Sequence, residues 1–251
     1  MWGKTGAAFC RSRLGEPCGH SFFGGYMLVQ EWMTKDVLAI TPDTSMMKAS
    51  RIMKDKKIRR LPVVDEHRKV LGIVSDRDIK EASPSNATTL DMHELYYLLS
   101  ELKVKDIMTK NPVCARENDS MEAMALLMEE KRFGGMPVVN KENILVGIIT
   151  ESDIFKVLAS ITGVRIGGVQ LAFELPTDSG TLQPILDALR ERGAGVLSML
   201  TAQEAGDSTT RRVYVRLRPL PEQEEQKIIA EIQKSFPSMI YWEPGMGRVS
   251  G

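Results

Sequence analysis

The sequence has few cysteines, few histidines and no net charge. Its 251 residues include three cysteines, Cys10, Cys18 and Cys114, an odd and sparse set unlike the paired framework of a disulfide-rich protein. Cys10 and Cys18 could pair in principle, but a reducing cytosol is the better expectation. The 33 lysines and arginines balance 33 aspartates and glutamates, so no overall field recruits nucleic acid or an anionic membrane.

Long apolar runs are absent as well. No run reaches the roughly 18 residues that a membrane-spanning helix needs, and a cytoplasmic location is therefore expected. Residues 1–26 lack the sustained apolar core of a signal peptide, and Met27 opens the first well-patterned segment. We interpret residues 1–26 as a disordered extension, a cloning remnant or a misplaced start, with a transit peptide as the alternative.

Groups for catalysis or metal binding are equally scarce. His20, His67 and His93 fall in the N-terminal segment, a predicted turn and a predicted linker, and none lies beside a serine or cysteine nucleophile in the sequence. Cys114 falls in a predicted strand and is expected in the core. No set of histidine, cysteine and acidic residues has metal-ligand spacing. The sequence therefore predicts no catalytic residue, no metal and no required cofactor, and we expect a protein that is not an enzyme.

What the sequence does contain is an internal repeat. From Met33 to Ile79, residue n resembles residue n + 75 without a gap. Chance could supply one match but hardly several in register. The matching segments are Met33-Thr34-Lys35 with Met108-Thr109-Lys110, Ser45-Met46 with Ser120-Met121, Pro62-Val63-Val64 with Pro137-Val138-Val139, Gly72-Ile73 with Gly147-Ile148, and Asp78-Ile79 with Asp153-Ile154.

Each repeat predicts the same series of elements. A short strand leads to a helix with apolar residues at helical spacing, then to two strands and a second helix that carries the aspartate. Thr44 or Ser45 can cap the first helix of repeat one, and Asp119 or Ser120 that of repeat two. Apolar strands flanked by helices indicate sheets covered on one side. The predicted strands are Leu38–Ile40, Leu61–Val64 and Val70–Val74, and Val113–Ala115, Met136–Val139 and Leu145–Ile149.

The end of the last strand in each repeat carries a shared motif. Gly72–Asp78 and Gly147–Asp153 consist of glycine, two β-branched residues, a hydroxyl, two variable residues and aspartate. Free backbone N–H groups at a helix start attract anions, and a carboxylate can accept both hydroxyls of a ribose. In the alternative, the hydroxyl only caps the helix and the aspartate favours its N-terminus electrostatically. Two copies in register favour the functional interpretation.

With these motifs the chain resembles the CBS domain over roughly residues 29–158. The resemblance implies two βαββα units in a pseudo-symmetric pair, called a Bateman module, that binds AMP, ADP, ATP or S-adenosylmethionine in clefts between its sheets. It implies that the aspartate holds ribose, that the hydroxyl reaches the sugar or a phosphate, and that Arg60 contacts phosphate. The nucleotide-binding residues so implied are Val37, Leu38, Arg60, Leu61, Pro62, Ser75, Arg77, Asp78, Pro112, Val113, Met136, Pro137, Thr150 and Asp153.

The two clefts are expected to differ in charge. Repeat one has Arg59-Arg60 before a strand and Arg77 inside its aspartate motif, whereas repeat two has Gly134-Gly135 at the first of these places. The forked guanidinium suits phosphate. We therefore predict that the cleft around Asp78 prefers a phosphorylated ligand. The other cleft is expected to be weaker, empty or dependent on basic residues from repeat one.

Two further segments lie in and between the repeats. The basic run Lys54–Arg60 is interpreted as a solvated helix end with nucleotide contacts rather than a nucleic-acid patch, because aromatic residues are not interleaved with it. Residues 83–103 are predicted as a linker, with a loop at Pro84–Thr89 and an amphipathic helix at Asp91–Leu102. Since CBS pairs commonly dimerise, we expect a homodimer.

The C-terminal third predicts the order β-α-β-β-α-β, the ferredoxin-like arrangement. Its elements are expected at Val169–Leu175, Leu182–Arg192, Val196–Leu200, Arg212–Leu217, Gln223–Phe236 and Met239–Trp242, with a turn and helix cap at Pro176–Thr181.

This order and the turn Asp178–Leu182 resemble the ACT domain, although Ser179 stands where that family usually has proline. The resemblance implies an amino-acid site at Asp178, Gly180 and Leu182, and a helix cap without ligand is the alternative. A CBS pair followed by an ACT-like domain is similar to the AcuB group, named for acetoin utilisation.

The expected fold class is α/β and α+β, a tandem CBS pair followed by a ferredoxin-like βαββαβ ACT domain. The expected domains are CBS repeat one at 27–82, CBS repeat two at 104–160 and the ACT-like domain at 166–246. The predicted function is allosteric sensing of an adenine nucleotide that regulates an unknown protein. Alternatives are a structural oligomerisation module and an S-adenosylmethionine binder.

Overall fold

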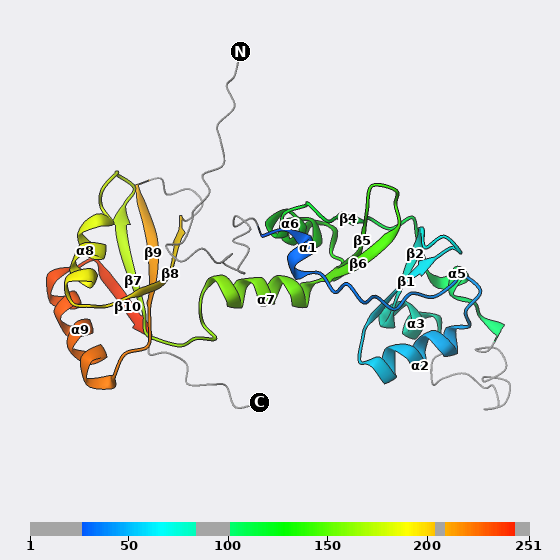
Figure 1. The fold of residues 1–251 in the computed structure, drawn as a ribbon, viewed down its shortest axis with the longest axis horizontal. Helices are drawn as coiled ribbons and strands as arrows, with labels where there is room; N and C mark the ends of the chain where they lie inside the picture. The colour runs from blue at the N-terminus through cyan, green and yellow to red at the C-terminus, as the bar shows by residue number, and fades with distance from the viewer. Residues whose placement is uncertain (1–26, 84–100, 204–208, 244–251) are drawn as a thin grey trace, which may run out of the picture.

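A computed structural model describes residues 27–83, 101–203 and 209–243 (Figure 1). Three predicted features lie outside these residues, wholly or in large part. They are the extension 1–26, the loop Pro84–Thr89 and the helix Asp91–Leu102 apart from its last two residues. In the described part of the chain, no helix has the length and apolar character needed to cross a bilayer.

Repeat one forms a small sheet flanked by helices. Ser45 caps α2, because its side chain accepts a hydrogen bond from the Lys48 N–H at 3.3 Å. The helix ends at Lys57, whose left-handed backbone (φ 53°) stops the helical path. The elements are α1 (Val29–Trp32), α2 (Met46–Lys56), β1 (Arg60–Val64), β2 (Val70–Ser75) and α3 (Asp76–Ala82).

Repeat two follows the same plan. Ser120 caps α6 as Ser45 caps α2, with a hydrogen bond of 3.2 Å from the Ala123 N–H. Met121, Met124 and Met128 fill its core, as expected from their helical spacing. The elements are α5 (Val104–Ile107), β3 (Thr109–Lys110), β4 (Ala115–Arg116), α6 (Met121–Lys131), β5 (Gly135–Val139), β6 (Leu145–Thr150) and α7 (Glu151–Ile161).

The two repeats exchange their leading segments. Thr34, from the start of repeat one, pairs with Ile148 of β6 through two backbone hydrogen bonds of 3.0 Å. In return β3 of repeat two pairs with β2 of repeat one. Val29 of α1 is buried in the core of repeat two, and Val104 of α5 in the core of repeat one. Each repeat therefore completes its hydrophobic core with residues that the sequence assigns to the other.

The exchange explains two glycines of the repeated motif. A side chain at Gly147 would place its Cβ 2.3 Å from Met33 Sδ, and one at Gly72 would place it 2.4 Å from Met108 Sδ. Any Cβ would collide with the exchanged methionine at these distances. The glycine of each motif thus admits the leading segment of the other repeat.

The predicted first strands, Leu38–Ile40 and Val113–Ala115, are wrong in extent. Only Ile40 pairs in repeat one, as an isolated parallel bridge to Val63, and the strand of repeat two is β4 (Ala115–Arg116). Leu38 is 45% exposed and Val113 is 46% exposed. These apolar side chains resemble a strand in the sequence but do not face the core.

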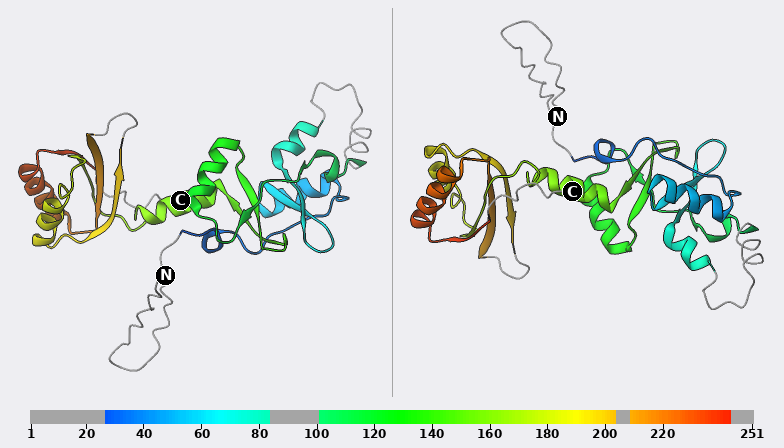
Figure 2. Two further views of the ribbon diagram at one scale, coloured as in Figure 1. Left: turned by 90° about the horizontal axis from the view of Figure 1, so that it is seen from above. Right: turned by 90° about the horizontal axis from the view of Figure 1, so that it is seen from below.

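The C-terminal domain has the predicted order of elements. Its sheet has the strand order β10-β7-β9-β8, and all neighbouring strands are antiparallel. Figures 1 and 2 show α8 and α9 on the sheet face that points away from the repeats. The elements are β7 (Gln170–Pro176), α8 (Gln183–Glu191), β8 (Val196–Ala202), β9 (Thr210–Leu217), α9 (Glu222–Ser235) and β10 (Met239–Glu243).

Helix α7 leads from the repeats to this domain (Figure 2). At its end, Ser198 Oγ on β8 donates a hydrogen bond of 2.8 Å to the Thr162 carbonyl. Beyond it, Arg216 Nη1 on β9 donates one of 2.9 Å to the Gly168 carbonyl. The connection is therefore fastened to the C-terminal sheet by side chains from two strands.

Candidate functional site

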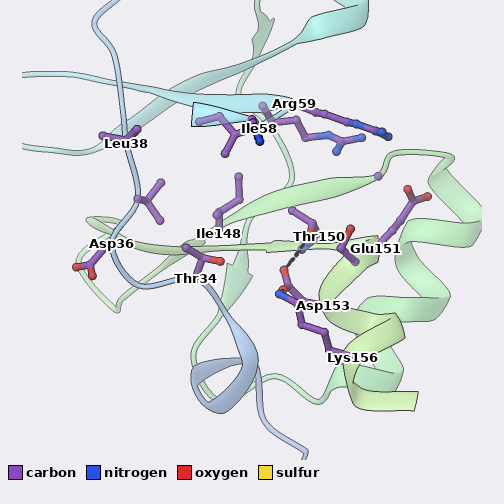
Figure 3. A pocket seen from close by; sticks show the side chains of 15 residues that line it. Thr34, Asp36, Leu38, Ile58, Arg59, Ile148, Thr150, Glu151, Asp153 and Lys156 are labelled. Carbon is purple, nitrogen blue, oxygen red and sulfur yellow. Dashed lines mark hydrogen bonds and ion pairs between the residues drawn. The ribbon is translucent and has the colours of Figure 1, made fainter. Parts of the chain in front are cut away.

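Two cavities lie between the repeats, and each takes residues from both. The first, the Asp153 cleft, has a volume of about 570 Å³. Figure 3 shows Ile58 and Arg59 on one side of it and Thr150, Glu151 and Asp153 on the other. Its lining residues are Thr34, Asp36, Val37, Leu38, Lys57, Ile58, Arg59, Arg60, Gly134, Ile148, Thr150, Glu151, Ser152, Asp153 and Lys156.

The carboxylate of the Asp153 cleft is fixed at the start of α7. Asp153 Oδ2 accepts hydrogen bonds from the Thr150 N–H at 3.0 Å and from Thr150 Oγ1 at 2.7 Å. Lys156 Nζ contacts the other oxygen, Oδ1, at 2.7 Å. Asp153 is only 2% exposed, so these three donors offset the cost of burying its charge.

The second cavity, the Asp78 cleft, has a volume of about 550 Å³. Asp78 Oδ2 accepts from the Ser75 N–H at 2.7 Å and from Ser75 Oγ at 2.8 Å, while Ser75 Oγ accepts from the Asp78 N–H at 3.3 Å. Its lining residues are Arg59, Arg60, Ile73, Ser75, Asp76, Arg77, Asp78, Lys80, Thr109, Arg132, Phe133, Gly134, Gly135 and Glu151.

The hydrogen bonds at the helix starts use one oxygen of each aspartate. Oδ2 makes the capping hydrogen bonds in both repeats. Within the described residues, Asp78 Oδ1 has no hydrogen-bond partner, whereas Asp153 Oδ1 is held by Lys156. The residue of repeat one that matches Lys156 is Glu81. Hydrogen bonds between the hydroxyl residue and the aspartate are therefore present at the start of both helices, and Asp78 keeps one oxygen without a partner among the described residues.

The predicted contrast in charge between the clefts is wrong. Arg59 and Arg60 line both cavities, and the Arg60 side chain reaches across to Gly134 and Gly135 of repeat two. The Asp153 cleft also has Lys57 and Lys156. Arg77, Lys80 and Arg132 complete the Asp78 cleft. Neither cleft is therefore poor in cations. As one of the expected alternatives held, basic residues of repeat one line the cleft that contains Asp153 of repeat two.

The predicted adenine walls are unevenly placed. Val37 and Leu38 line the Asp153 cleft, beside the motif of the other repeat, as a result of the exchange. Pro112 and Val113 line neither of the two cavities. Leu61, Pro62, Met136 and Pro137 line neither as well, because they are buried within β1 and β5.

Several lining residues were not predicted individually from the sequence, although Lys57 and Ile58 lie in the run Lys54–Arg60 for which nucleotide contacts were expected. Lys57 and Ile58 follow the end of α2, and Lys156 lies one turn after Asp153. Glu151 and Phe133 were also missed. The basic run Lys54–Arg60 was the available signal for Lys57, but only the folded chain shows which cleft it faces.

The C-terminal turn differs from its prediction. Helix α8 begins at Gln183 with Leu182 at the N-cap, and no side chain caps it. Asp178 is exposed and its carbonyl accepts a hydrogen bond of 3.1 Å from Thr181 Oγ1. Gly180 has a positive φ of 84°, and Leu182 packs against the core of the domain. The predicted helix cap is therefore wrong, whereas the amino-acid site at this turn stays a prediction.

Cys114 and the acidic side chains are, by residue type, possible catalytic or metal-binding groups. Cys114 is half-buried, and burial raises the pKa of its thiol, opposed by the nearby Arg116 charge. Its Sγ contacts the Pro112 carbonyl at 3.4 Å. Among the described residues, no group of three histidine, cysteine or acidic side chains could hold a metal ion.

The chain is similar to proteins with paired CBS domains. It is 33% identical over 135 residues to a CBS domain-containing protein of Dictyostelium discoideum, covering 54% of this chain and 93% of that protein. It is 37% identical over 126 residues to inosine-5'-monophosphate dehydrogenase of Methanocaldococcus jannaschii, but spans only 22% of that enzyme.

Solved structures resemble the same half of the chain. A putative acetoin utilization protein, AcuB, of Vibrio cholerae matches 55% of it with 27% identity and a TM-score of 0.47, over 95% of its own length. CBSX2 in complex with AMP, a protein of Arabidopsis thaliana, matches 55% with 31% identity and a TM-score of 0.46, over 99% of its own length. The CBS domain model itself matches residues 29–85 and 104–160. With both repeats matched and nearly the whole Dictyostelium relative covered, the chain belongs to the CBS domain family.

Proposed function

We propose that the CBS pair is a regulatory sensor that binds an adenine nucleotide between its repeats. The Asp153 cleft carries this proposal, since it combines an apolar wall, a fixed hydroxyl–carboxylate pair and several cations in one cavity of about 570 Å³. That size suits a nucleotide-sized ligand. Val37, Leu38 and Ile58 would contact the base, Asp153 the ribose, and Arg59 and Arg60 the phosphate.

The Asp78 cleft supports a second, different site. Asp78 Oδ1, which has no hydrogen-bond partner among the described residues, suits a ribose, and Arg77 and Arg132 suit phosphate. The apolar side chains that line this cleft are Ile73 and Phe133. A base would gain less contact there than against Val37 and Leu38. We therefore propose that the nucleotide occupies the Asp153 cleft first, the reverse of the preference predicted from the sequence.

Thermal unfolding of the dialysed chain tests this function. A ligand that binds the folded state stabilises it by RT ln(1 + [L]/Kd), which is about 4 kcal/mol for a micromolar Kd at millimolar ligand. AMP, ADP or ATP should raise the melting temperature, and guanosine monophosphate should raise it less. Equal effects of adenine and guanine nucleotides would show that the clefts bind phosphate without reading the base.

S-Adenosylmethionine is the alternative ligand of the same cleft. Asp36 and Glu151 line it and could face a sulfonium or ammonium group. Competition decides between AMP and S-adenosylmethionine. If S-adenosylmethionine displaces labelled AMP at lower concentrations than unlabelled AMP does, it is the preferred ligand. A chain that no adenine ligand stabilises would favour a purely structural oligomerisation role, and hydrolysis of ATP lost with Asp78→Ala would indicate an enzyme.

For the C-terminal domain we propose an ACT-like, ferredoxin-like module. The antiparallel order β10-β7-β9-β8, with both helices on one face, supports this assignment. An amino acid would bind at Asp178, Gly180 and Leu182, next to Arg211, whose Nη2 donates to Thr181 Oγ1 at 3.2 Å. A thermal-shift panel of the common amino acids, compared with Asp178→Ala, tests the site. Homodimer formation and a role in acetoin utilisation likewise stay proposals.

A further inference from the structure

The wall between the two clefts is made by the same few residues. Arg59, Arg60, Gly134 and Glu151 line both cavities. The clefts are therefore neighbours that meet at one pair of arginines, rather than separate sites with their own cations. The phosphate ends of two ligands would both point toward this pair if each ligand placed its ribose at an aspartate.

Arg60 occupies this position because repeat two has glycine there. A Cβ at Gly134 would lie 2.2 Å from Arg60 Nη2 and 2.7 Å from Glu151 Oε2. A Cβ at Gly135 would lie 3.4 Å from Arg60 Cδ. The guanidinium therefore lies across Gly134-Gly135, which are the repeat-two counterparts of Arg59-Arg60. A second arginine pair at positions 134 and 135 would compete with Arg60 for the same space. The protein has one arginine pair here, contributed by repeat one.

The electrostatic consequence concerns two phosphates and the single guanidinium that lies across Gly134-Gly135, that of Arg60. In the part of the chain that the structure describes, neither Arg59 nor Arg60 forms a salt bridge, so both are available to an anion. A guanidinium binds one phosphate through a two-pronged contact. A second phosphate would lose that contact, and any part of it within the Debye length of about 8 Å of the first would also be repelled by it.

We propose that Arg60 is a ligand-binding residue shared by both clefts, so that a phosphorylated nucleotide in one cleft weakens the binding of a second in the other. This inference rests on the proposed nucleotide binding. It adds a negative coupling between the sites, which we expect to be about tenfold. The coupling depends on phosphate, and adenosine should bind the two clefts independently.

Isothermal titration of the full chain with AMP tests the sharing. Arg60→Gln should weaken AMP at both sites by roughly 10- to 100-fold, because a charge-assisted contact is lost in each. Two matched variants each line one cleft only: Lys57→Gln should weaken the Asp153 cleft and Arg77→Gln the Asp78 cleft. If Arg60→Gln weakened one site alone, the inference would be overturned while nucleotide binding stood.

A second pair of variants tests the coupling and protects against misfolding. Leu38→Trp fills the apolar end of the Asp153 cleft, and AMP should then bind the Asp78 cleft about tenfold more tightly than it binds there in the wild-type chain. An unchanged affinity would contradict the coupling. Gly134→Ala retains both arginines but displaces the Arg60 side chain, so it should weaken AMP and not adenosine. Equal weakening of both ligands would overturn the role of Arg60, and no AMP binding to the wild type would remove the proposed function itself.

Discussion

At the scale of single residues, the hydroxyl and aspartate of each motif serve the helix and the cavity together. Asp153 Oδ2 accepts two hydrogen bonds from Thr150, and Asp78 Oδ2 accepts two from Ser75. The carboxylates are thereby fixed in orientation before any ligand arrives, which lowers the entropy cost of binding. Lys156 makes the two motifs unequal, because it occupies the remaining oxygen of Asp153.

Lys156→Gln should change the choice between nucleoside and nucleotide. Its ammonium would compete with a bound ribose for Asp153 Oδ1, and its side chain is 55% exposed, so the ion pair is screened and weak. We expect adenosine to bind the Asp153 cleft about 2- to 5-fold more tightly in the variant. AMP should gain less, because it loses a cation. Titration calorimetry with both ligands measures the ratio, and an unchanged ratio would contradict the assigned contact.

Cys114 should react slowly with alkylating agents. Burial raises the pKa of its thiol, so the thiolate, which is the reactive form, is scarcer at neutral pH than in an exposed cysteine. In the unfolded chain the alkylation rate should stop rising once pH exceeds the pKa of an exposed thiol. In the native chain it should continue to rise to higher pH. Mass spectrometry resolved by peptide measures this rate in the native and urea-unfolded chain. A native rate equal to the unfolded one at pH 7 would contradict the burial of Cys114.

The sequence predicts the identities of these residues better than their partners. Ser75, Asp78, Thr150 and Asp153 lie at cleft-lining helix starts, because a local motif determines a local structure. The wall that accompanies each aspartate depends on contacts between distant segments. Leu38 therefore had no local signal that would assign it to Thr150 rather than to Ser75.

At the scale of elements, the exchanged segments determine how the repeats hold together. The helix spacing and most strands follow from apolar periodicity within each repeat. The exchange does not follow from it. The two repeats have similar local patterns, so a leading segment could pack on its own repeat or on the other one. Only the packing of α1 on repeat two and of α5 on repeat one distinguishes them.

Val29→Ala and Val104→Ala should destabilise the pair although both lie in short leading helices. Each valine is 0% exposed in the core of the opposite repeat. Removing two buried carbons should cost about 2 kcal/mol in the free energy of unfolding, measured by urea titration. Val113→Ala is the matched control and should change it by less than about 0.5 kcal/mol, because Val113 is 46% exposed. Equal effects of all three substitutions would argue against the exchange.

At the scale of the whole molecule, α7 joins the candidate sensor to the C-terminal domain. Its first residues line the Asp153 cleft, and the carbonyl of Thr162 at its end accepts a hydrogen bond from Ser198. One continuous helix thus contacts both parts. A ligand bound at the first turn of α7 would therefore be connected to the C-terminal sheet through a single helix.

Hydrogen exchange should detect this route. We expect AMP to slow amide exchange in α7 and in residues 162–169 by at least about fivefold, the lower end of typical coupling energies. Helix α9, on the far face of the C-terminal sheet, is the internal control and should not change. Protection confined to the lining of the clefts would show that the nucleotide does not affect the connection.

If an adenine nucleotide binds at the two aspartates, both carboxylates contribute to its affinity. Titration calorimetry of AMP into the wild type and into the Asp78→Asn, Asp153→Asn double variant tests it most directly, because asparagine can still accept the capping hydrogen bonds. Asp178→Asn, in the C-terminal domain, is the matched control. We expect AMP to bind the wild type and the control alike and to bind the double variant at least about tenfold more weakly. Equal affinity for all three chains would contradict it.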